Sequence, residues 1–522
     1  MNIKKYFSDH INAFFYNQHN VIFLSLIVLL GTILRLYDLG TESFWFDEII
    51  TVDRVSHNLQ TLVHQLATQG NMTRNAVYYL LAHFWVLPFK ITEVSIRSLS
   101  ALFGVLSIGM MYLVGKQLFG EKVGLLSSFF MAVSEFQIQY SQEARFYSLF
   151  VLLTLVSLYC YIFAFKTKQL RLWIVSSLIN ILLFYTHTYA IFIFVAEYIH
   201  YFIYWKSNRN TLAQWSISQA LLVLAIVAGL IPLLREGSAA GFGSGLAWIT
   251  IPSFKDLLSI VYGYLFPQNY QHSWFFIGVS FAIGVIFFII GAFYFNFRNV
   301  KNNWLAQLNS WFRNIRFPFP ALVSSEFVLA VLWFVCPVIL PFIYSNIFSP
   351  ILVDRYTICA APAFYILIAI AISRISRVVP VYIALGALMI VILPGLQDYY
   401  AADINEQWRK VAAFVYEDSA PNDAIVLAPD DEGYQSKSFD WYYQGVLPRC
   451  GISLNIKSDQ AIANSLSSCT LGHERFWLIM RGSSKVVNQN KSFFLSPDQT
   501  AMHLIKEKQF VMISVYLFEL TK

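Results

Sequence analysis

Apolar runs of about 20 residues recur along this chain, and they limit its possible folds more than any other feature. The first run, VIFLSLIVLLGTIL, covers Val21–Leu34, and others follow it as far as residue 396. A helix of about 20 residues crosses the hydrocarbon core of a bilayer with all its backbone groups bonded internally. Hydrophobic residues make up 57% of the 522 positions and charged residues only 13%, which excludes an ordinary soluble core. The sequence therefore predicts an α-helical polytopic membrane protein.

We expect about eleven membrane-spanning helices. The first covers residues 21–34, and the others lie near residues 98–116, 121–139, 146–165, 172–187, 188–205, 213–234, 273–296, 325–346, 353–373 and 379–396. If the N-terminus is cytoplasmic, every short inside loop carries lysine or arginine, as the positive-inside rule requires. An odd number of spans then places the chain from about residue 397 onward outside the cytoplasm. The net charge of +6 reports this orientation and indicates no nucleic-acid partner.

The predicted organisation is a transmembrane domain in residues 1–396, with long external loops at 37–97 and 235–271, and a soluble extracytoplasmic α/β domain in residues 397–522. In the latter, QWRKVAAFVYED has helical spacing. AIVLAP, RFWLIM and FVMISVYLFEL are candidate strands. Cys450 and Cys469 also fall there, and an external compartment permits a disulfide between them. Two free thiols are the alternative, and the sequence leaves both open.

Asp47 and Glu48 are adjacent carboxylates just after the first span, in the segment ESFWFDEIITVD. The aromatic residues before them are expected to hold the pair near the membrane interface, partly removed from water. Such a carboxylate suits a general base that acts on a hydroxyl acceptor. The alternative is a solvated pair of loop residues. The same two carboxylates are the candidate ligands if the protein binds a divalent metal, although oxygen ligands usually come in larger sets.

Charged residues also occur at the expected outer ends of two later spans. EARFYS contains Arg145 and SPILVDRYT contains Arg355, and arginine is well suited to hold a phosphate with two hydrogen bonds. Ionisable residues at membrane depth usually face a bundle interior or an aqueous cavity. The alternatives are local pairing with Glu143 or Asp354, or extension of the side chain to the interface. His187, in YTHTYA, is a weaker candidate, since an interfacial histidine with satisfied bonds is common.

Five blocks, in the same order along the chain, resemble the polyprenyl-phosphate-dependent glycosyltransferases of the protein O-mannosyltransferase and lipid A aminoarabinose transferase superfamily. The blocks are WFDEIITVD, VYYLLAHFW with SIRSLSALFGVLSI, SQEARFYSLFVLLTLVSLY, YTHTYA and DRYTICAAPAFYILIA. The similarity extends over most of the first 380 residues, and the tail is similar to the external domain of bacterial members. The resemblance implies a GT-C-like fold in a bacterial inner or plasma membrane.

The resemblance also implies an activity, namely an inverting transfer from a polyprenyl-phosphate sugar donor to a lipid, glycan or protein acceptor at the external membrane face. Asp47 matches the position that deprotonates or orients the acceptor hydroxyl, and Glu48 accompanies it in the catalytic pair as an acceptor or metal contact. Arg145 and Arg355 match basic positions near the donor phosphate. Further substrate-binding positions implied by the resemblance are Tyr78, Tyr147, His187 and Tyr356.

The chain departs from the family before the Tyr-Tyr helix, where members often have His/Asn-Pro-Pro and this sequence has Arg74-Asn75-Ala76-Val77. Two other functions are compatible with a polytopic protein. A transporter or flippase of lipid-linked glycans predicts charges deep in mid-span and inverted repeats, which do not stand out here. A receptor or assembly factor would leave the Asp-Glu loop unexplained.

Overall fold

The computed structural model describes residues 3–69, 73, 75–240, 249–266, 324–374, 378–430, 433–453, 459–482 and 502–521. The span expected at 273–296 and the GFGSG part of the second external loop lie outside these residues. The chain forms two compact units. A helical unit comprises Met1–Tyr37, Asn58–Leu87 and Arg97–Asp398, and a tail unit comprises Asp38–His57, Pro88–Ile96 and Tyr399–Lys522. The tail unit thus includes two segments of the first predicted external loop.

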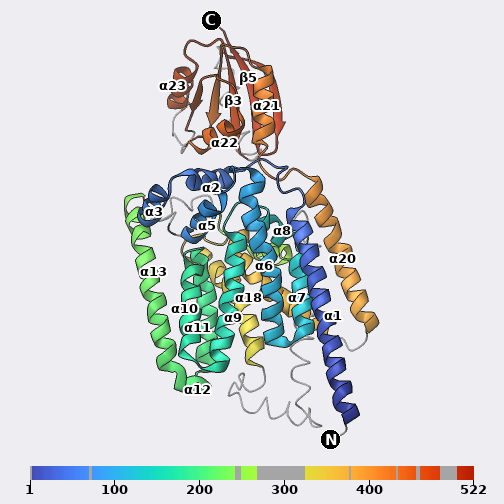
Figure 1. Ribbon diagram of the computed structural model, residues 1–522. Helices are drawn as coiled ribbons and strands as arrows, with labels where there is room; N and C mark the ends of the chain where they lie inside the picture. The colour runs from blue at the N-terminus through green and yellow to red at the C-terminus, as the bar shows by residue number, and fades with distance from the viewer. Residues whose placement is uncertain are drawn as a thin grey trace. The chain divides into compact units, whose positions relative to one another are not determined.

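The helical unit consists of long apolar helices joined by short turns and short helices (Figure 1). They are α1 (Ile3–Leu36), α3 (Leu59–Thr68), α5 (Ala76–Val86), α6 (Glu93–Phe119), α7 (Glu121–Val133), α8 (Glu135–Ser141), α9 (Tyr147–Thr167), α10 (Leu170–Phe184), η1 (Thr188–Ala190), α11 (Ile191–Ile203), α12 (Trp205–Asn208), η2 (Arg209–Thr211), α13 (Leu212–Ala240), α14 (Phe254–Gly263), α18 (Ser325–Ile347), η5 (Asp354–Ala360), α19 (Ala361–Ser373) and α20 (Val378–Ala401).

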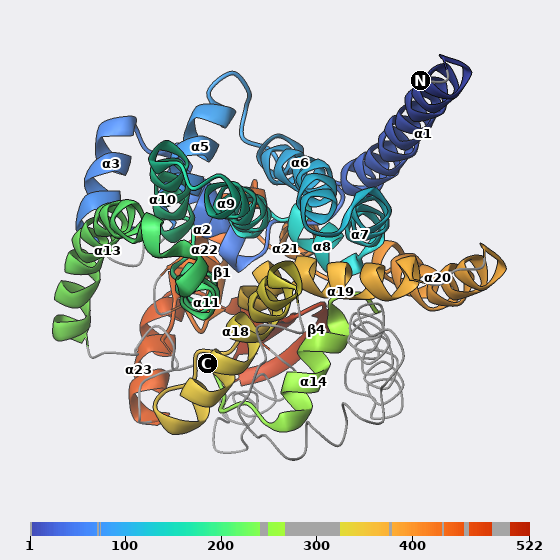
Figure 2. The ribbon, with the colours of Figure 1, turned by 90° about the horizontal axis from the view of Figure 1, so that it is seen from below.

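Six helical stretches among the described residues are long and apolar enough to cross a membrane. They differ in burial, because Asp354–Ser373 is 83% buried over its most apolar window whereas Gln18–Leu36 is only 17% buried. Figure 2 shows why: α19 packs against both α7 and α18, while α1 lies at the edge. Phe23 and Leu26 of α1 are more than half exposed, as expected for side chains that face lipid.

Two of the predicted spans are interrupted helices. The span expected at 121–139 ends at Val133, because the Ser134 side chain accepts a hydrogen bond from the Gln137 amide and begins α8. The span expected at 353–373 starts as the 3-10 helix η5 and becomes α-helical at Ala361. The hairpin at 172–205 forms as α10 and α11. At about 1.5 Å per residue, α7, α10 and α11 are each shorter than the hydrocarbon core.

Helix ends inside the helical unit are capped by side chains from other helices. The buried Arg35 guanidinium, at the end of α1, donates to the carbonyl oxygens of Met131 (3.0 Å) and Ala132 (3.1 Å) in the last turn of α7. The Gln142 amide in turn donates to the Tyr37 carbonyl oxygen (2.7 Å), just beyond α1. The last carbonyls of a helix have no partner within it, so these bonds satisfy groups that water does not reach.

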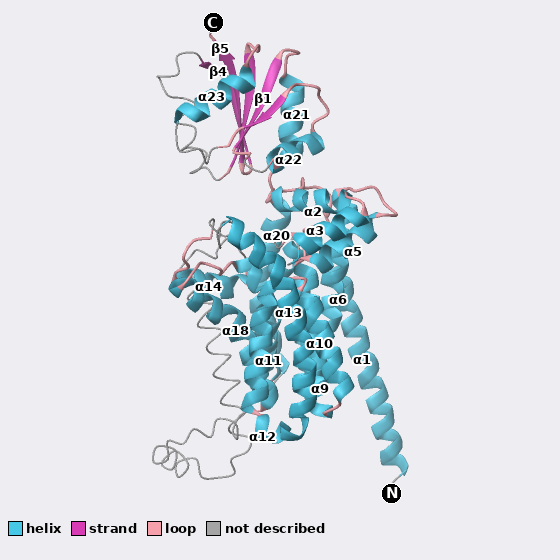
Figure 3. Ribbon diagram, turned by 90° about the vertical axis from the view of Figure 1, so that its left-hand side faces the viewer, coloured by secondary structure: helices cyan, strands magenta, loops and turns pink. Residues whose placement is uncertain are grey.

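The tail unit is built on a mixed sheet with strand order β2-β1-β3-β5-β4 (Figure 3). β1 pairs in parallel with β2 and β3, whereas β5 pairs antiparallel with β3 and β4. The strands are β1 (Asp423–Ala428), β2 (Arg449–Gly451), β3 (Arg475–Arg481), β4 (Met502–Phe510) and β5 (Ile513–Leu520). The helices are α2 (Phe46–Ser56), α21 (Trp408–Asp418), α22 (Tyr434–Tyr442) and α23 (Asp459–Thr470). The predicted α/β fold of the tail is therefore confirmed.

Alternate residues of the central strands form two apolar cores. Ile425 and Leu427 of β1 pack with Trp408 of α21, and Val426 packs on the opposite face with Ile462 of α23. Strands that are buried on both faces need continuous apolar runs, which is why AIVLA and RFWLIM are so hydrophobic. β4 lies at the edge of the sheet, and its residues, MHLIKEKQF, are mostly exposed and contain no long apolar run.

Cys450 in β2 and Cys469 in α23 form a disulfide with a Cα–Cα distance of 5.7 Å. Cys160, Cys336 and Cys359, in the helical unit, are free. The structure thus decides between the two alternatives that the sequence left open.

We predict that the Cys450→Ser/Cys469→Ser variant loses the two maleimide adducts that reduction reveals in the denatured full-length protein. Hydrogen exchange of the β1 and β3 amides should show a loss of about 3 kcal/mol in local stability, because the cross-link restricts the unfolded chain. Cys336→Ser serves as the control and should keep both reduction-dependent adducts. Labelling of all five cysteines before reduction would contradict the assignment.

Candidate functional site

Residues from separate sequence blocks meet at one end of the helical unit. The Tyr78 hydroxyl on α5 lies 2.9 Å from the Ser100 hydroxyl on α6. Ser100 donates to the Arg145 carbonyl oxygen at 3.1 Å, between α8 and α9. All three residues are buried. One serine thus joins the Tyr-Tyr helix, the SIRSLS span and the EARFYS segment.

The start of α5 is bonded to the turn that precedes His187. The Asn75 side-chain amide donates to the Thr186 carbonyl oxygen at 2.9 Å, and the Val77 amide donates to the Tyr185 carbonyl oxygen at 3.2 Å. Asn75 and Val77 belong to the segment where this chain lacks the Pro-Pro pair of the family it resembles. In this chain the two hydrogen bonds to the Tyr185 and Thr186 carbonyl oxygens fix the residues before α5, so prolines are not needed there.

A continuous series of aromatic rings connects the two arginines. Arg145 lies over the Phe146 ring at 4.8 Å, and Phe146 and His187 have ring centroids 5.0 Å apart. His187 then contacts the Tyr356 ring at 4.8 Å, and Arg355 lies 5.9 Å from the same Tyr356 ring. Cation–π contacts of this kind hold a guanidinium at a defined place without neutralising its charge. Both guanidinium groups therefore lie against one connected series of aromatic rings.

Local backbone bonds orient these side chains. The His187 Nδ1 atom accepts the Tyr189 amide at 3.1 Å, so Nε2 carries the proton of the neutral ring. The Asp354 carboxylate accepts the Arg355 amide at 2.7 Å. Tyr147, the first residue of α9, is buried and contacts the Tyr140 ring at 4.9 Å. Arg355 and Tyr356 remain half-buried, so this part of the cluster is accessible.

Asp47 and Glu48 lie in the first turn of α2, in the tail unit, and differ in exposure. Asp47 is half-buried, whereas Glu48 is fully buried. The Glu48 carboxylate accepts the Trp45 amide at 3.4 Å, which is one half of a capping box. Successive residues on a helix point about 100° apart, so the two carboxylates face different surroundings. This geometry favours a structural role for Glu48 and leaves Asp47 as the accessible carboxylate.

The residues before α2 are held by the tail domain. The Tyr442 hydroxyl accepts the Phe44 amide at 2.8 Å and donates to the Glu93 carboxylate at 2.6 Å. Burial, followed by the hydrogen bond to Glu93, raises the pKa of Tyr442 well above its ordinary value. The hydroxyl therefore stays protonated and keeps both bonds across the physiological pH range. The Arg409 amide also donates to the Ser43 hydroxyl at 3.1 Å.

Within the described ranges of the chain, no group of three or more His, Cys, Asp or Glu side chains is arranged to hold a metal ion. The expected pair, Asp47 and Glu48, offers fewer oxygen ligands than Mg²⁺ or Ca²⁺ usually takes, and Glu48 already bonds its own helix.

A second polar cluster, which belongs to none of the sequence motifs above, lies inside the helical unit. The buried Glu197 carboxylate on α11 is bonded to Ser157 on α9 (3.0 Å) and to Asn180 on α10 (2.9 Å). Tyr161 bonds the His200 Nδ1 atom at 2.8 Å, and His200 Nε2 reaches Ser325 at 3.0 Å. The sequence contained a signal for this cluster, because Glu197 is an ionisable residue within an apolar run. Such residues are costly in a membrane span and usually have a structural or functional role.

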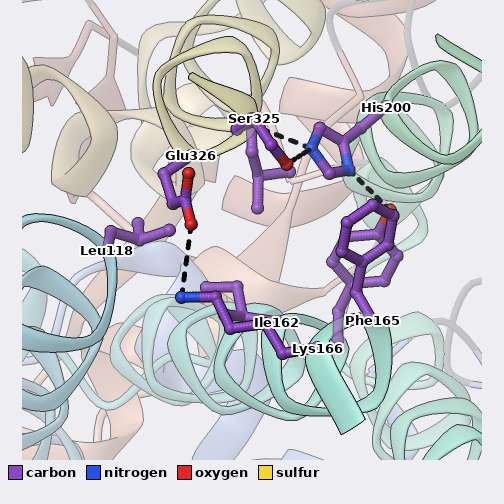
Figure 4. Close-up of a pocket in the computed structure, with 9 residues that line it drawn as sticks. Leu118, Ile162, Phe165, Lys166, His200, Ser325 and Glu326 are labelled. Atoms are coloured by element: carbon purple, nitrogen blue, oxygen red, sulfur yellow. Dashed lines mark hydrogen bonds and ion pairs between the residues drawn. The ribbon is translucent and has the colours of Figure 1, made fainter. Parts of the chain in front are cut away.

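His200 and Ser325 line a cavity of about 160 Å³, which Lys166 and Glu326 also border (Figure 4). The Lys166 ammonium and the Glu326 carboxylate form an ion pair at 3.3 Å. Lys166 lies in the last turn of α9 and Arg145 precedes the first turn of the same helix, so at about 1.5 Å per residue this cavity is roughly 30 Å from the arginine cluster. The two clusters are separate.

Comparison with known proteins gives one family match. Residues 62–233 match the model for dolichyl-phosphate-mannose-protein mannosyltransferases, and this stretch contains Tyr78, Arg145, Tyr147 and His187. No curated protein sequence matches the chain significantly.

Solved structures share the fold of the chain. ArnT from Cupriavidus metallidurans in the apo state is 10% identical with a TM-score of 0.55, covering 96% of this chain and 98% of ArnT. The same protein bound to undecaprenyl phosphate gives 11% identity and a TM-score of 0.50, with 95% and 97% coverage. An Archaeoglobus fulgidus oligosaccharyltransferase, tethered to an acceptor peptide containing the NVT sequon, gives 12% identity, a TM-score of 0.50, and 90% and 70% coverage. The GT-C-like fold is confirmed, as is the resemblance to polyprenyl-phosphate-dependent glycosyltransferases.

The central position of Ser100 gives a prediction about stability. Ser100→Val removes the bond to the Arg145 carbonyl oxygen and the partner of the Tyr78 hydroxyl, so it should cost about 2–4 kcal/mol of local stability. Tyr78→Phe removes a single bond and should cost about 1 kcal/mol. Hydrogen exchange of α5 and of residues 142–146 in the detergent-solubilised protein measures both effects. Tyr79→Phe is the control, and an equal effect of all three changes would count against the geometry.

Proposed function

We propose that this chain is a membrane glycosyltransferase that moves a sugar from a polyprenyl-phosphate-linked donor to an acceptor hydroxyl. The family match over residues 62–233 and the shared fold support a membrane glycosyltransferase with a lipid-linked donor. The observation that carries the proposal is the convergence of Tyr78, Arg145, His187 and Arg355 at one end of the helical unit. Two cations beside aromatic rings suit a phosphate joined to a sugar and a polyprenyl chain.

In the proposed reaction the acceptor oxygen attacks the anomeric carbon from the face opposite the phosphate, so the configuration inverts. The new C–O bond forms as the bond between that carbon and the phosphate oxygen breaks, and the polyprenyl phosphate leaves with the electron pair. Asp47 takes the acceptor proton as general base. Arg145 and Arg355 bind the phosphate and stabilise the negative charge that develops on it. Tyr147, His187 and Tyr356 line the donor position.

The acceptor is a lipid, a glycan or a protein hydroxyl, and the reaction takes place at the external face of a bacterial inner or plasma membrane. Basic residues in the predicted inside loops support this orientation, because they place the tail domain and the WFDE segment outside the cytoplasm. The disulfide in the tail agrees with an oxidising compartment.

A flippase of lipid-linked glycans is the second candidate, and Glu197 is the observation that favours it. Transport proteins often carry ionisable residues deep in their spans. In this chain, however, the Glu197 carboxylate is bonded by Ser157 and Asn180 on neighbouring helices, which also describes a structural contact between helices. The two functions differ in a measurable product, since only the transferase releases free polyprenyl phosphate.

We predict that Asp47→Asn abolishes release of polyprenyl phosphate from radiolabelled polyprenyl-phosphate sugars in proteoliposomes, with a loss of about 10²-fold or more. Asp53→Asn is the matched control, because Asp53 lies on the same helix and pairs with the exposed Lys437 (2.8 Å) of the tail. Equal turnover by wild type and Asp47→Asn would keep the enzyme and remove Asp47 as base. Lipid translocation without any donor turnover would favour the flippase.

The phosphate role of the arginines predicts a different kinetic signature. Arg145→Lys and Arg355→Lys keep a positive charge but lose the bidentate geometry, so we expect the KM for the donor to rise about tenfold or more. Lys166→Met, at the other end of α9, should leave this KM unchanged. The measurement is initial rate against donor concentration. Unchanged donor KM in both lysine variants would remove these arginines from the donor site.

A further inference from the structure

Glu406 connects the tail domain to the helix that carries Asp47. Its carboxylate is buried and accepts hydrogen bonds from the Trp408 indole (2.7 Å), the Arg481 guanidinium (2.7 Å) and the Phe46 backbone amide (3.2 Å). Trp408 is the first residue of α21, and Arg481 is the last residue of strand β3. Phe46 is the first residue of α2, 360 residues earlier in the chain.

The bond to Phe46 supplies a helix cap that the local sequence lacks. The first amides of a helix have no partner within it, and Ser, Thr, Asp or Asn normally accepts one of them from the preceding position. That position is Trp45 here, which has no acceptor side chain. Glu406 provides the missing oxygen, and its negative charge also interacts favourably with the helix dipole at this end.

Arg481 contacts the side chain of Phe46. Its guanidinium carbon lies 4.4 Å from the centroid of the Phe46 ring while its Nε atom bonds Glu406. The Phe46 ring also meets the Tyr434 ring edge-on at 5.7 Å. Both the backbone and the side chain of Phe46, which directly precedes Asp47, are therefore fixed by groups of the tail domain.

We propose that Glu406, supported by Arg481, is a positioning residue that orients the Asp47 carboxylate through the first turn of α2. This inference rests on the proposed role of Asp47 as base. It assigns the tail domain a direct part in the chemical step, because displacing a catalytic group by about 1 Å can cost about 10²-fold in rate. Asp47 would then be misplaced, but not lost, when Glu406 is changed.

The tail contains a close match to this arrangement that does not reach α2. The buried Asp423 carboxylate accepts from the Arg475 guanidinium (2.7 and 2.9 Å) and from the Trp477 indole (3.1 Å). Asp423 and Glu406 thus share burial, an arginine partner and a tryptophan partner. They differ in their last partner, since Asp423 accepts the Ala420 amide within the tail and Glu406 accepts the Phe46 amide.

The experiment compares Glu406→Gln with Asp423→Asn in the full-length protein. We expect Glu406→Gln to lower kcat by about 10²-fold with the donor KM unchanged, whereas Asp423→Asn loosens the tail but keeps kcat within a few-fold. In an Asp47→Asn background, Glu406→Gln should have no further effect, because residues that act as a unit are not additive. Equal kcat losses in the two single variants would reduce Glu406 to a structural residue.

Hydrogen exchange provides a readout that does not depend on activity. Glu406→Gln should speed exchange of the first-turn amides of α2, and Asp423→Asn should not. If the protein shows no donor turnover but α2 exchange responds as expected, the contact stands and the proposed function fails. If turnover depends on Asp47 while α2 exchange and kcat are unchanged in Glu406→Gln, the positioning role is overturned.

Discussion

Lipid does not solvate polar groups, and this constraint explains how several of the described helix ends in the helical unit are bonded. The carbonyls that end α7 are bonded by Arg35, the residues after α1 are bonded by Gln142, and the turn before His187 is bonded by Asn75. The partners come from different parts of the chain, since Arg35 lies in α1, Gln142 directly follows α8 and Asn75 directly precedes α5. Breaks in the helices are therefore tolerated where several helix ends meet, and there they place backbone and charged groups next to one another.

The candidate donor site follows from this arrangement. Arg145 lies between α8 and α9, His187 between α10 and η1, and Arg355 in the 3-10 helix that begins the α19 span. These three helix interruptions, each of which would be costly alone, are connected to one another by contacts of Ser100, Phe146 and Tyr356. A continuous helix at any of these positions would point its side chains at lipid or a neighbouring helix. The interruptions are what allow polar side chains to face a common, partly accessible region.

The sequence predicted those parts of the fold whose signal is local. The apolar runs predicted α1, α6, α9, α13 and α18, and continuous buried patterns predicted β1 and β3. β4 was not predicted, because an edge strand with exposed charged residues has no apolar run. The break at Ser134 was missed for a related reason, since a serine in an apolar stretch is compatible with a continuous helix. Its capping bond reaches the Gln137 amide only three residues later, so the SEFQ pattern at 134–137 is a local signal that the prediction from apolar runs overlooked.

The site shows the same division between local and distant information. Motif order identified Tyr78, Arg145, His187 and Arg355, but contacts between residues far apart in sequence decide that they meet. Asp47 and Glu48 look equivalent as neighbours in sequence, yet one is accessible and the other is a buried cap. Glu406 carries no motif at all, because its partner Phe46 is 360 residues away.

The WFDE segment begins a short helix, α2, that lacks a local N-cap, and residues of the tail stabilise its first turn. An isolated helix of 11 residues is marginal in water, and α2 lacks a capping residue at Trp45. A carboxylate on such a helix would sample many orientations, whereas a general base must lie within hydrogen-bond reach of the proton that it removes. Glu406, Arg481 and Tyr442 bond or pack against residues 44 and 46, just before Asp47. In the proposed reaction, the tail residues would therefore contribute by ordering the segment that carries Asp47.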